Sequence, residues 1–149
     1  MLNITIIENK NIFDSHCQVL VNPINCVGVM GKGIALEMKN KYPEMFLKYK
    51  ELCDKNLLDI GKLWLYKISE EKQILNFPTK KDWKDLSHYK YIEEGMEKFV
   101  KSYKDKNIKS IAFPLLGCGN GKLNKDNILE IITKHLIKCK DLYVEIYYN

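Results

Sequence analysis

The fold is decided by residues 19–33, VLVNPINCVGVMGKG, in which an apolar run leads directly into a glycine-rich loop. Residues 110–122, SIAFPLLGCGNGK, repeat this pattern. Unbroken apolar runs are typical of buried strands, and glycine lets the following backbone approach a ligand with its amides directed at an anion. One such loop is more simply explained as a tight strand-to-helix connection. Two in one chain instead favour a pair of loops that hold one diphosphate from both sides.

Length and composition indicate one globular domain, residues 1–149. The chain is 46% hydrophobic and 29% charged, which is enough to bury a core without a second folding unit. Its net charge of +5 is carried by 24 lysines, with no arginine, so anions must be bound by backbone amides and ammonium groups. The positive charge suits a polyanion such as DNA, but scattered lysines are also typical of a solvated surface.

The five cysteines do not form a metal-site pattern. Their number is odd, and no C-x-x-C pair or zinc-type spacing is present, so we expect reduced, mostly buried thiols and no metal. The sequence shows no signal peptide and no run of roughly 20 apolar residues that could span a bilayer. We therefore expect a cytoplasmic protein that does not interact with membranes.

Strands and helices are expected to alternate along the chain. Strands are predicted at residues 2–8, 19–24, 63–68, 73–77, 110–113 and 141–148. Helices are predicted after the first glycine-rich loop, from Pro43 to about Asp54, from a cap at Ser87 to about Tyr103, and over 124–138. This alternation indicates an α/β fold with a mixed or mostly parallel sheet covered on both faces. Ligands of such folds bind beyond the carboxyl ends of the strands, where both glycine-rich loops are expected.

Neither glycine-rich loop is a common nucleotide-binding motif. A Walker A sequence is absent, and Leu123 stands where a hydroxyl would hold magnesium. The second loop reads G-x-G-x-G, with too little chain after it to complete a dinucleotide-binding unit. The three histidines are isolated in sequence, and no serine or cysteine lies in a nucleophile elbow. These observations argue against an ATPase and a dehydrogenase, and the catalytic group must be sought elsewhere.

The best remaining candidate for chemistry is NFPTKKDWK, residues 76–84. This segment leaves a predicted buried strand at the same sheet edge and contains Lys80, Lys81 and Lys84. Partial burial and neighbouring positive charge lower the pKa of a lysine and make a neutral, nucleophilic amine available. Lys80, nearest the strand end, is the favoured nucleophile. The alternative is a lysine-rich solvated turn.

Several segments together resemble the macrodomain family. They are LVNPIN at 20–25, GVMGKGIAL at 28–36, KYPEMF at 41–46, NFPTK at 76–80 and PLLGCGNG at 114–121. Within this family the chain resembles the ALC1-like class, which contains the terminal ADP-ribose protein glycohydrolase and the antitoxin macrodomain DarG, and the DarG branch is the more similar. The resemblance implies a single macrodomain, a three-layer α/β/α sandwich around a mixed, mostly parallel sheet. It also implies an ADP-ribose cleft, with no cofactor and no metal.

The resemblance implies roles for individual residues. Lys80 is expected to attack the anomeric carbon of the distal ribose, expel the modified group and form a transient adduct that water resolves. Asn25 or Asn22 is expected to bind the ribose hydroxyls, with Asn25 assigned to the catalytic pair. The other residues expected to contact ADP-ribose are Asn11, Ile12, Asn22, Gly28, Val29, Met30, Gly31, Lys32, Gly33, Ile34, Thr79, Leu116, Gly117, Cys118, Gly119, Asn120 and Gly121.

Two positions differ from the family pattern. The protein glycohydrolase has an acidic residue in its second loop that helps to resolve the adduct, whereas this chain has Asn120, Gly121 and Lys122 there; the DarG branch lacks the acid too. Macrodomains generally hold the adenine amino group with an aspartate after the first strand. The matching residue here is Asn11, whose side-chain carbonyl is a weaker acceptor than a carboxylate.

The resemblance therefore predicts an ADP-ribosyl glycohydrolase that binds ADP-ribose. The expected substrates are DNA with mono-ADP-ribose on thymidine and, as a second possibility, proteins ADP-ribosylated on acidic side chains. A DarT-like toxin in a linked system is a further expected partner. Two alternatives stay open, a reader that binds ADP-ribose without turnover and a phosphatase that acts on ADP-ribose 1″-phosphate. The phosphatase would depend on the glycine-rich loops and asparagines but not on Lys80.

Overall fold

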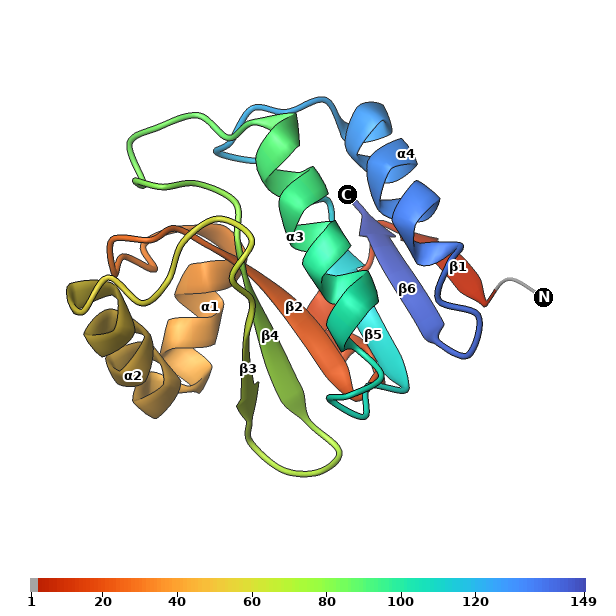
Figure 1. Ribbon diagram of the computed structural model, residues 1–149, viewed down its shortest axis with the longest axis horizontal. Helices are drawn as coiled ribbons and strands as arrows, with labels where there is room; N and C mark the ends of the chain where they lie inside the picture. Colours follow the sequence, from red (N-terminus) through yellow and green to blue (C-terminus); the bar gives the residue numbers. More distant parts are fainter. Residues whose placement is uncertain (1–2) are drawn as a thin grey trace.

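The computed structural model describes residues 3–149, which contain one six-stranded sheet (Figure 1). Its strands are β1 (Ile4–Glu8), β2 (Val19–Ile24), β3 (Trp64–Lys67), β4 (Gln73–Pro78), β5 (Ser110–Pro114) and β6 (Tyr143–Tyr148). Their order in the sheet is β1-β6-β5-β2-β4-β3. Neighbouring strands run parallel except β3 and β4, which are antiparallel. The expectation of a mixed, mostly parallel sheet is confirmed.

Helices cover both faces of this sheet (Figure 1). They are α1 (Gly33–Lys41), α2 (Pro43–Asp54), α3 (Tyr89–Ser102) and α4 (Lys125–Leu136), together with the short 3-10 helix η1 (Ile12–Asp14). Helices α3 and α4 lie side by side on one face, and α1 and α2 pack on the other. The predicted three-layer α/β/α sandwich is therefore confirmed. From residue 3 to residue 149, no helix is both long enough and apolar enough to cross a membrane.

Each face of the sheet has its own apolar core. On one face, Phe77 of β4 packs with Phe99 of α3, and on the other, Leu20 of β2 packs with Tyr49 of α2. All four side chains are almost completely buried. Strands β2 and β4 lie inside the sheet and are covered on both faces, as expected for strands in which polar and apolar residues do not alternate.

Local sequence sets most helix termini. Pro43 occupies the first turn of α2, where its missing N–H group is not needed. Asn124 caps α4 by accepting a hydrogen bond from the Asn127 N–H at 3.0 Å. The predicted ends of strands and helices differ from the observed ones by no more than about two residues. Leu2, which the sequence assigns to the first strand, lies outside the described residues.

Ser87 does not cap a helix, so that prediction is wrong. Helix α3 begins at Tyr89 after His88, and no side chain caps its amino end. The Ser87 hydroxyl instead donates a hydrogen bond to the main-chain carbonyl of Thr79, and the Ser87 N–H donates to the carbonyl of Gly121 at 3.1 Å. The spacing of residues along a helix gives no information about these partners, because they lie in other segments.

Candidate active site

A cavity of about 790 Å³ opens at the carboxyl ends of β2, β4 and β5. Its wall is formed mainly by three segments, which we name the first loop (residues 25–33), the lysine segment (residues 79–87) and the second loop (residues 115–122). Each segment follows one of three neighbouring parallel strands. The two glycine-rich loops therefore meet at one edge of the sheet, as the strand directions require.

Asn25 organises the first loop. Its Oδ1 accepts hydrogen bonds from the N–H groups of Val27 at 3.1 Å and Val29 at 3.3 Å, and its Nδ2 donates to the Val29 carbonyl at 2.7 Å. The hydroxyl of Tyr49 lies 2.7 Å from Asn25 Oδ1 and 2.8 Å from the Asn25 carbonyl oxygen. Asn25 also lines the cavity. The second N–H of its side-chain amide is not used by these contacts and can serve a bound sugar.

Four residues expected to contact the ligand line neither this cavity nor a smaller pocket beside it. Asn22 is fully buried in β2, where its Nδ2 donates to Asn76 Oδ1 at 3.0 Å. Met30 and Leu116 are also buried, and Gly28 packs against α2. These residues support the loops from behind, and of the two asparagines considered for the ribose hydroxyls only Asn25 is at the cavity wall.

The other expected contact residues line this cavity or a smaller pocket of about 450 Å³ beside it. The two hollows share wall residues of both loops, among them Gly33, Ile34 and Gly119. The expected residues on the main cavity are Asn25, Val29, Gly31, Lys32, Gly33, Ile34, Thr79, Lys80, Gly117, Gly119, Asn120 and Gly121, and those on the smaller pocket alone are Asn11, Ile12 and Cys118. One lone pair of the Asn11 side-chain carbonyl already accepts the Phe13 N–H at 2.9 Å.

The lysine segment is joined to both glycine-rich loops. At one end, the Cys26 N–H of the first loop donates to the Lys81 carbonyl at 3.0 Å. At the other end, Ser87 is held against Gly121 and Gly117 of the second loop. A Cβ at Gly117 would lie 2.9 Å from Ser87 Oγ, and the φ of +76° at this residue also requires glycine.

Lys80 projects its amine along the cavity wall. Its Nζ donates a hydrogen bond to the Trp83 carbonyl at 3.4 Å. Partial burial lowers the pKa of this amine, the positive charge of Lys32 lowers it further, and the negative charge of Asp85 opposes the shift. A lowered pKa increases the fraction of neutral, nucleophilic amine near neutral pH.

The cysteines at the site are protonated at neutral pH. Burial raises the pKa of Cys26 to about 12 and that of Cys118 to about 11. A thiol reacts as its thiolate, so neither residue is a competent nucleophile. Of Lys80, Cys26 and Cys118, only Lys80 has a pKa shift that favours its nucleophilic form.

Four residues of the lysine segment line the cavity but were not assigned a ligand contact from the sequence, although the first two of them lie in the candidate segment 76–84. They are Trp83, Lys84, Asp85 and Leu86. Their position on the same strand end was the signal that could have found them. Asp85 is the only carboxylate on the wall of the main cavity within residues 3–149.

The fold and the cavity together define the class of protein. Residues 21–132 match the family model described as Macro domain. The chain therefore belongs to the macrodomain family.

Within this family the chain is similar to DarG macrodomains. The macrodomain of Mycobacterium tuberculosis DarG superposes with a TM-score of 0.92 and 37% identity, over 98% of this chain and 97% of that one. Thermosipho africanus DarTG in complex with ADP-ribose gives a TM-score of 0.90 and 34% identity, over 99% of this chain and 42% of that one. A DNA ADP-ribosyl glycohydrolase from Mycobacterium tuberculosis is 40% identical over 133 residues, which are 87% of this chain and 38% of that protein. The chain thus spans about two fifths of the length of the curated relatives it matches.

Proposed function

We propose that this macrodomain is an ADP-ribosyl glycohydrolase that removes mono-ADP-ribose from thymidine in DNA. The observation that carries the proposal is the amine of Lys80, which has a lowered pKa and lies on the wall of a cavity between two glycine-rich loops. The similarity to a DNA ADP-ribosyl glycohydrolase supports DNA as the substrate. The similarity to DarTG in complex with ADP-ribose supports the ligand.

In this proposal the diphosphate lies between the first and second loops. Their main-chain N–H groups and the ammonium group of Lys32 balance its charge. The adenosine end extends into the smaller pocket lined by Asn11 and Ile12. The distal ribose lies against Lys80 and Asn25 at the other end of the cavity, so its anomeric carbon is within reach of the amine.

The neutral amine of Lys80 attacks the anomeric carbon of this ribose. A bond forms between Nζ and the carbon, while the bond from the carbon to the thymine nitrogen breaks and its electron pair leaves with the base. The base takes up a proton and Nζ loses one, which leaves a covalent adduct. Water then adds to the anomeric carbon, the bond to Nζ breaks, and ADP-ribose and the free lysine are released.

Replacement of Lys80 tests this mechanism. We expect Lys80→Ala to slow the release of ADP-ribose from an oligonucleotide with ADP-ribosylated thymidine by roughly 100-fold or more, because a lost nucleophile removes the main reaction path. Affinity for ADP-ribose, measured by calorimetry, should persist. Lys81→Ala is the matched control, since Lys81 is exposed and does not line the cavity. Full activity of Lys80→Ala would overturn the lysine mechanism.

A second readout detects the adduct itself. Borohydride added during turnover should reduce the open-chain form of the adduct and leave ADP-ribose attached to the wild-type protein, with peptide mass spectrometry placing it on Lys80. Neither Lys80→Ala nor protein without substrate should be labelled.

A protein modified on glutamate serves as the second substrate in the same assay. Faster release of ADP-ribose from this protein than from the oligonucleotide would indicate that the physiological substrate is protein-linked ADP-ribose. A non-catalytic reader is the other candidate, because Asn120, Gly121 and Lys122 give the second loop no carboxylate. Binding of ADP-ribose without release from either substrate would select the reader. Phosphate release from ADP-ribose 1″-phosphate that survives in Lys80→Ala would select the phosphatase.

We further propose that the chain works with a DarT-like toxin that attaches ADP-ribose to DNA. The similarity to a DarTG structure supports this partner. Co-expression of such a toxin with the wild-type chain should permit growth, whereas co-expression with Lys80→Ala should not if catalysis is the protective activity.

A further inference from the structure

We propose that Trp83 selects a nucleobase as the leaving group by stacking its indole against the base that departs from the distal ribose. This inference rests on the proposed function and adds a specificity-determining residue to it. The glycine-rich loops hold the part of the ligand that all ADP-ribosylated substrates share, so they cannot distinguish one leaving group from another.

Trp83 contacts the proposed nucleophile through its main chain. Its main-chain carbonyl accepts the hydrogen bond from Lys80 Nζ at 3.4 Å, and the residue lines the same cavity. The leaving group is bonded to the carbon that Lys80 attacks. A departing base must therefore lie within a few ångströms of the reacting atoms, in the same cavity that Trp83 lines.

The exposure of Trp83 also points to a flat, aromatic partner. The residue is 49% exposed, although most large apolar residues of this chain are buried. Half-exposed aromatic side chains beside a nucleic-acid substrate act as stacking platforms, because every base offers a π-face. A glutamate side chain offers no such face, so stacking at this position favours DNA over protein as the modified substrate.

Lysines on the cavity wall, one of them beside the indole, match the charge of a DNA strand. Lys84 Nζ lies 5.6 Å from the centre of the Trp83 ring, and Lys84 and Lys122 both line the cavity. A nucleotide that places its base on Trp83 carries phosphates on either side of the sugar. These lysines are positioned to balance those charges.

The experiment compares one substitution on two substrates. We expect Trp83→Ala to lower kcat/KM for the ADP-ribosylated oligonucleotide by roughly 5- to 100-fold, the range of one lost base–aromatic stack. The main-chain carbonyl that holds Lys80 persists in this variant, so release from a glutamate-modified protein and affinity for ADP-ribose should stay near wild type. Trp83→Phe should recover most of the DNA activity. Leu47→Ala is the control, because Leu47 is 64% exposed and does not line the cavity.

Two results would overturn the inference while leaving the proposed function intact. One is full DNA activity in Trp83→Ala, and the other is an equal loss on both substrates, which would indicate a purely structural role.

Tryptophan fluorescence separates this inference from the proposed function. Trp64→Phe leaves Trp83 as the single tryptophan. A thymidine oligonucleotide added to this variant, saturated with ADP-ribose, should quench the emission, whereas an abasic oligonucleotide of equal charge should not. If the wild type releases ADP-ribose from neither substrate, the proposed function fails, and quenching by the thymidine oligonucleotide still supports Trp83 as a base-stacking residue. Equal responses to both oligonucleotides would overturn the stacking proposal.

Discussion

The pKa of Lys80 depends on two neighbouring charges that reach the cavity from different segments. Burial lowers this pKa most. The positive charge of Lys32 in the first loop is the next largest cause and also lowers the pKa, whereas the negative charge of Asp85 in the lysine segment raises it. The lowered pKa of Lys80 therefore comes from its burial and from Lys32 of the first loop, and the neighbouring Lys81 and Lys84 are not among its causes.

Removal of either charge should shift the pH dependence of the proposed reaction in a defined direction. Because the neutral amine reacts, the rate rises as the pH increases through the pKa of Lys80. Lys32→Gln removes a like charge, so the pKa of Lys80 rises and the ascending limb of the pH–rate profile moves to higher pH. Asp85→Asn removes an opposite charge, so the limb moves to lower pH. Single-turnover release of ADP-ribose from neutral to alkaline pH measures both shifts.

Lys122→Gln is the control for these variants. Lys122 also lines the cavity, but it is not among the causes of the Lys80 shift, so the limb should stay in place. Movement of the limb in one direction by both Lys32→Gln and Asp85→Asn would contradict the electrostatic explanation.

Individual side chains show how far the sequence could predict the candidate site. Lys80 was predictable because it follows a buried strand directly, and the strand fixes where the chain emerges. Asn22 and Ser87 were not, because their partners come from distant segments. The Asn22 side-chain N–H donates to Asn76 of the neighbouring strand, and Ser87 joins Thr79 to the second loop. Only the packed sheet brings these atoms together.

Among the elements, α3 and β4 make a contact that depends on one glycine. A Cβ at Gly95 of α3 would overlap the ring of Phe77, which is fully buried in β4. Phe77 precedes the lysine segment by only a few residues. The close approach of α3 to β4 therefore helps to fix the strand end from which Lys80 emerges.

Gly95→Ala should destabilise the fold. Overpacking against Phe77 costs about 1–3 kcal/mol, and although alanine is about 1 kcal/mol better than glycine in a helix, we expect a net loss in the free energy of unfolding. Urea unfolding followed by circular dichroism measures the change. Glu97→Ala, at an exposed position of the same helix, should alter stability by about 0.5 kcal/mol or less. A more stable Gly95→Ala variant would show that α3 and β4 can separate without cost.

At the level of elements, apolar periodicity predicted which face of a helix is buried, but it did not predict which residues of other elements that face contacts. Helical spacing identified the inward face of α3, and Ile92 and Phe99 are indeed buried. The same spacing does not show that the Phe77 ring lies directly against Gly95 and leaves no room there for a side chain. It also cannot show that a serine near a helix start is used elsewhere.

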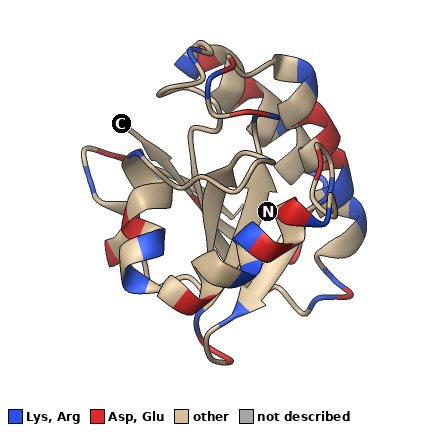
Figure 2. Ribbon diagram, turned by 90° about the vertical axis from the view of Figure 1, so that its left-hand side faces the viewer, with Lys and Arg blue, Asp and Glu red and all other residues tan. Residues whose placement is uncertain are grey.

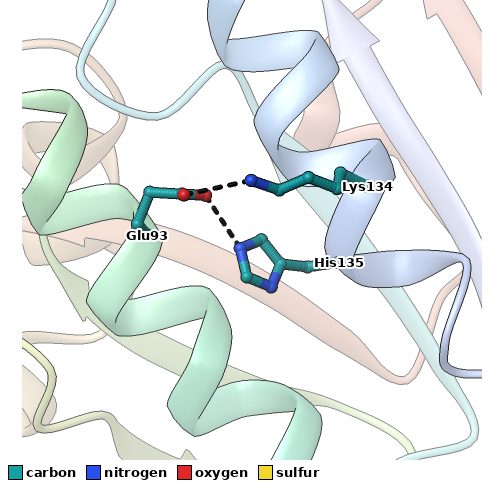
Figure 3. Close-up of polar contacts among 3 residues, drawn as sticks. All are labelled: Glu93, Lys134 and His135. Atoms are coloured by element: carbon teal, nitrogen blue, oxygen red, sulfur yellow. Dashed lines mark hydrogen bonds and ion pairs between the residues drawn. The ribbon is translucent and has the colours of Figure 1, made fainter.

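Over the whole molecule, two carboxylates link segments that are far apart in the chain. Figure 3 shows Glu93 of α3 between Lys134 and His135 of α4, with its oxygens 3.1 Å from Lys134 Nζ and 2.8 Å from His135 Nε2. Burial raises the pKa of Glu93, but the hydrogen bonds and charge of these two residues outweigh it, so the pKa is lower than usual.

The second carboxylate, Glu145 of β6, lies among hydroxyl groups. Its oxygens accept hydrogen bonds from Ser15 at 2.6 Å, Tyr143 at 2.9 Å and Tyr147 at 3.0 Å. Burial again raises the pKa, and these donors outweigh it and lower the pKa overall. Ser15 lies in the connection after η1, so this group ties that connection to the sheet.

Acid should weaken the fold through both carboxylates. Each pKa is lower in the folded chain than in the unfolded chain, so the stabilisation is complete above the usual pKa of a glutamate and is lost as the pH falls through the lowered value. We expect Glu145→Gln to be less stable than wild type at neutral pH and to lose less stability on acidification. Urea midpoints at neutral and acidic pH measure both effects. Glu71→Gln, in an exposed turn, is the control, and a wild-type acid response in Glu145→Gln would contradict this assignment.

The surface charge of the molecule is mixed. On the side shown in Figure 2, lysines and acidic residues are interspersed along the helices and loops. The net charge of +5 is therefore not gathered on that side into one basic face.

The attachment of the lysine segment at both ends sets a limit on its length. Cys26 holds one end through the Lys81 carbonyl, and Ser87 holds the other through the Gly121 carbonyl, so residues 82–86 act as a spacer of fixed size. We expect a residue inserted or deleted within 82–86 to break one of these two hydrogen bonds and to shift the Trp83 carbonyl away from Lys80. Evolution can lengthen the turn at residues 69–72, at the opposite end of β4, without this penalty. The number of residues between the positions of Lys81 and Ser87 therefore predicts, from sequence alone, which related chains can place a main-chain carbonyl beside the lysine as Trp83 does.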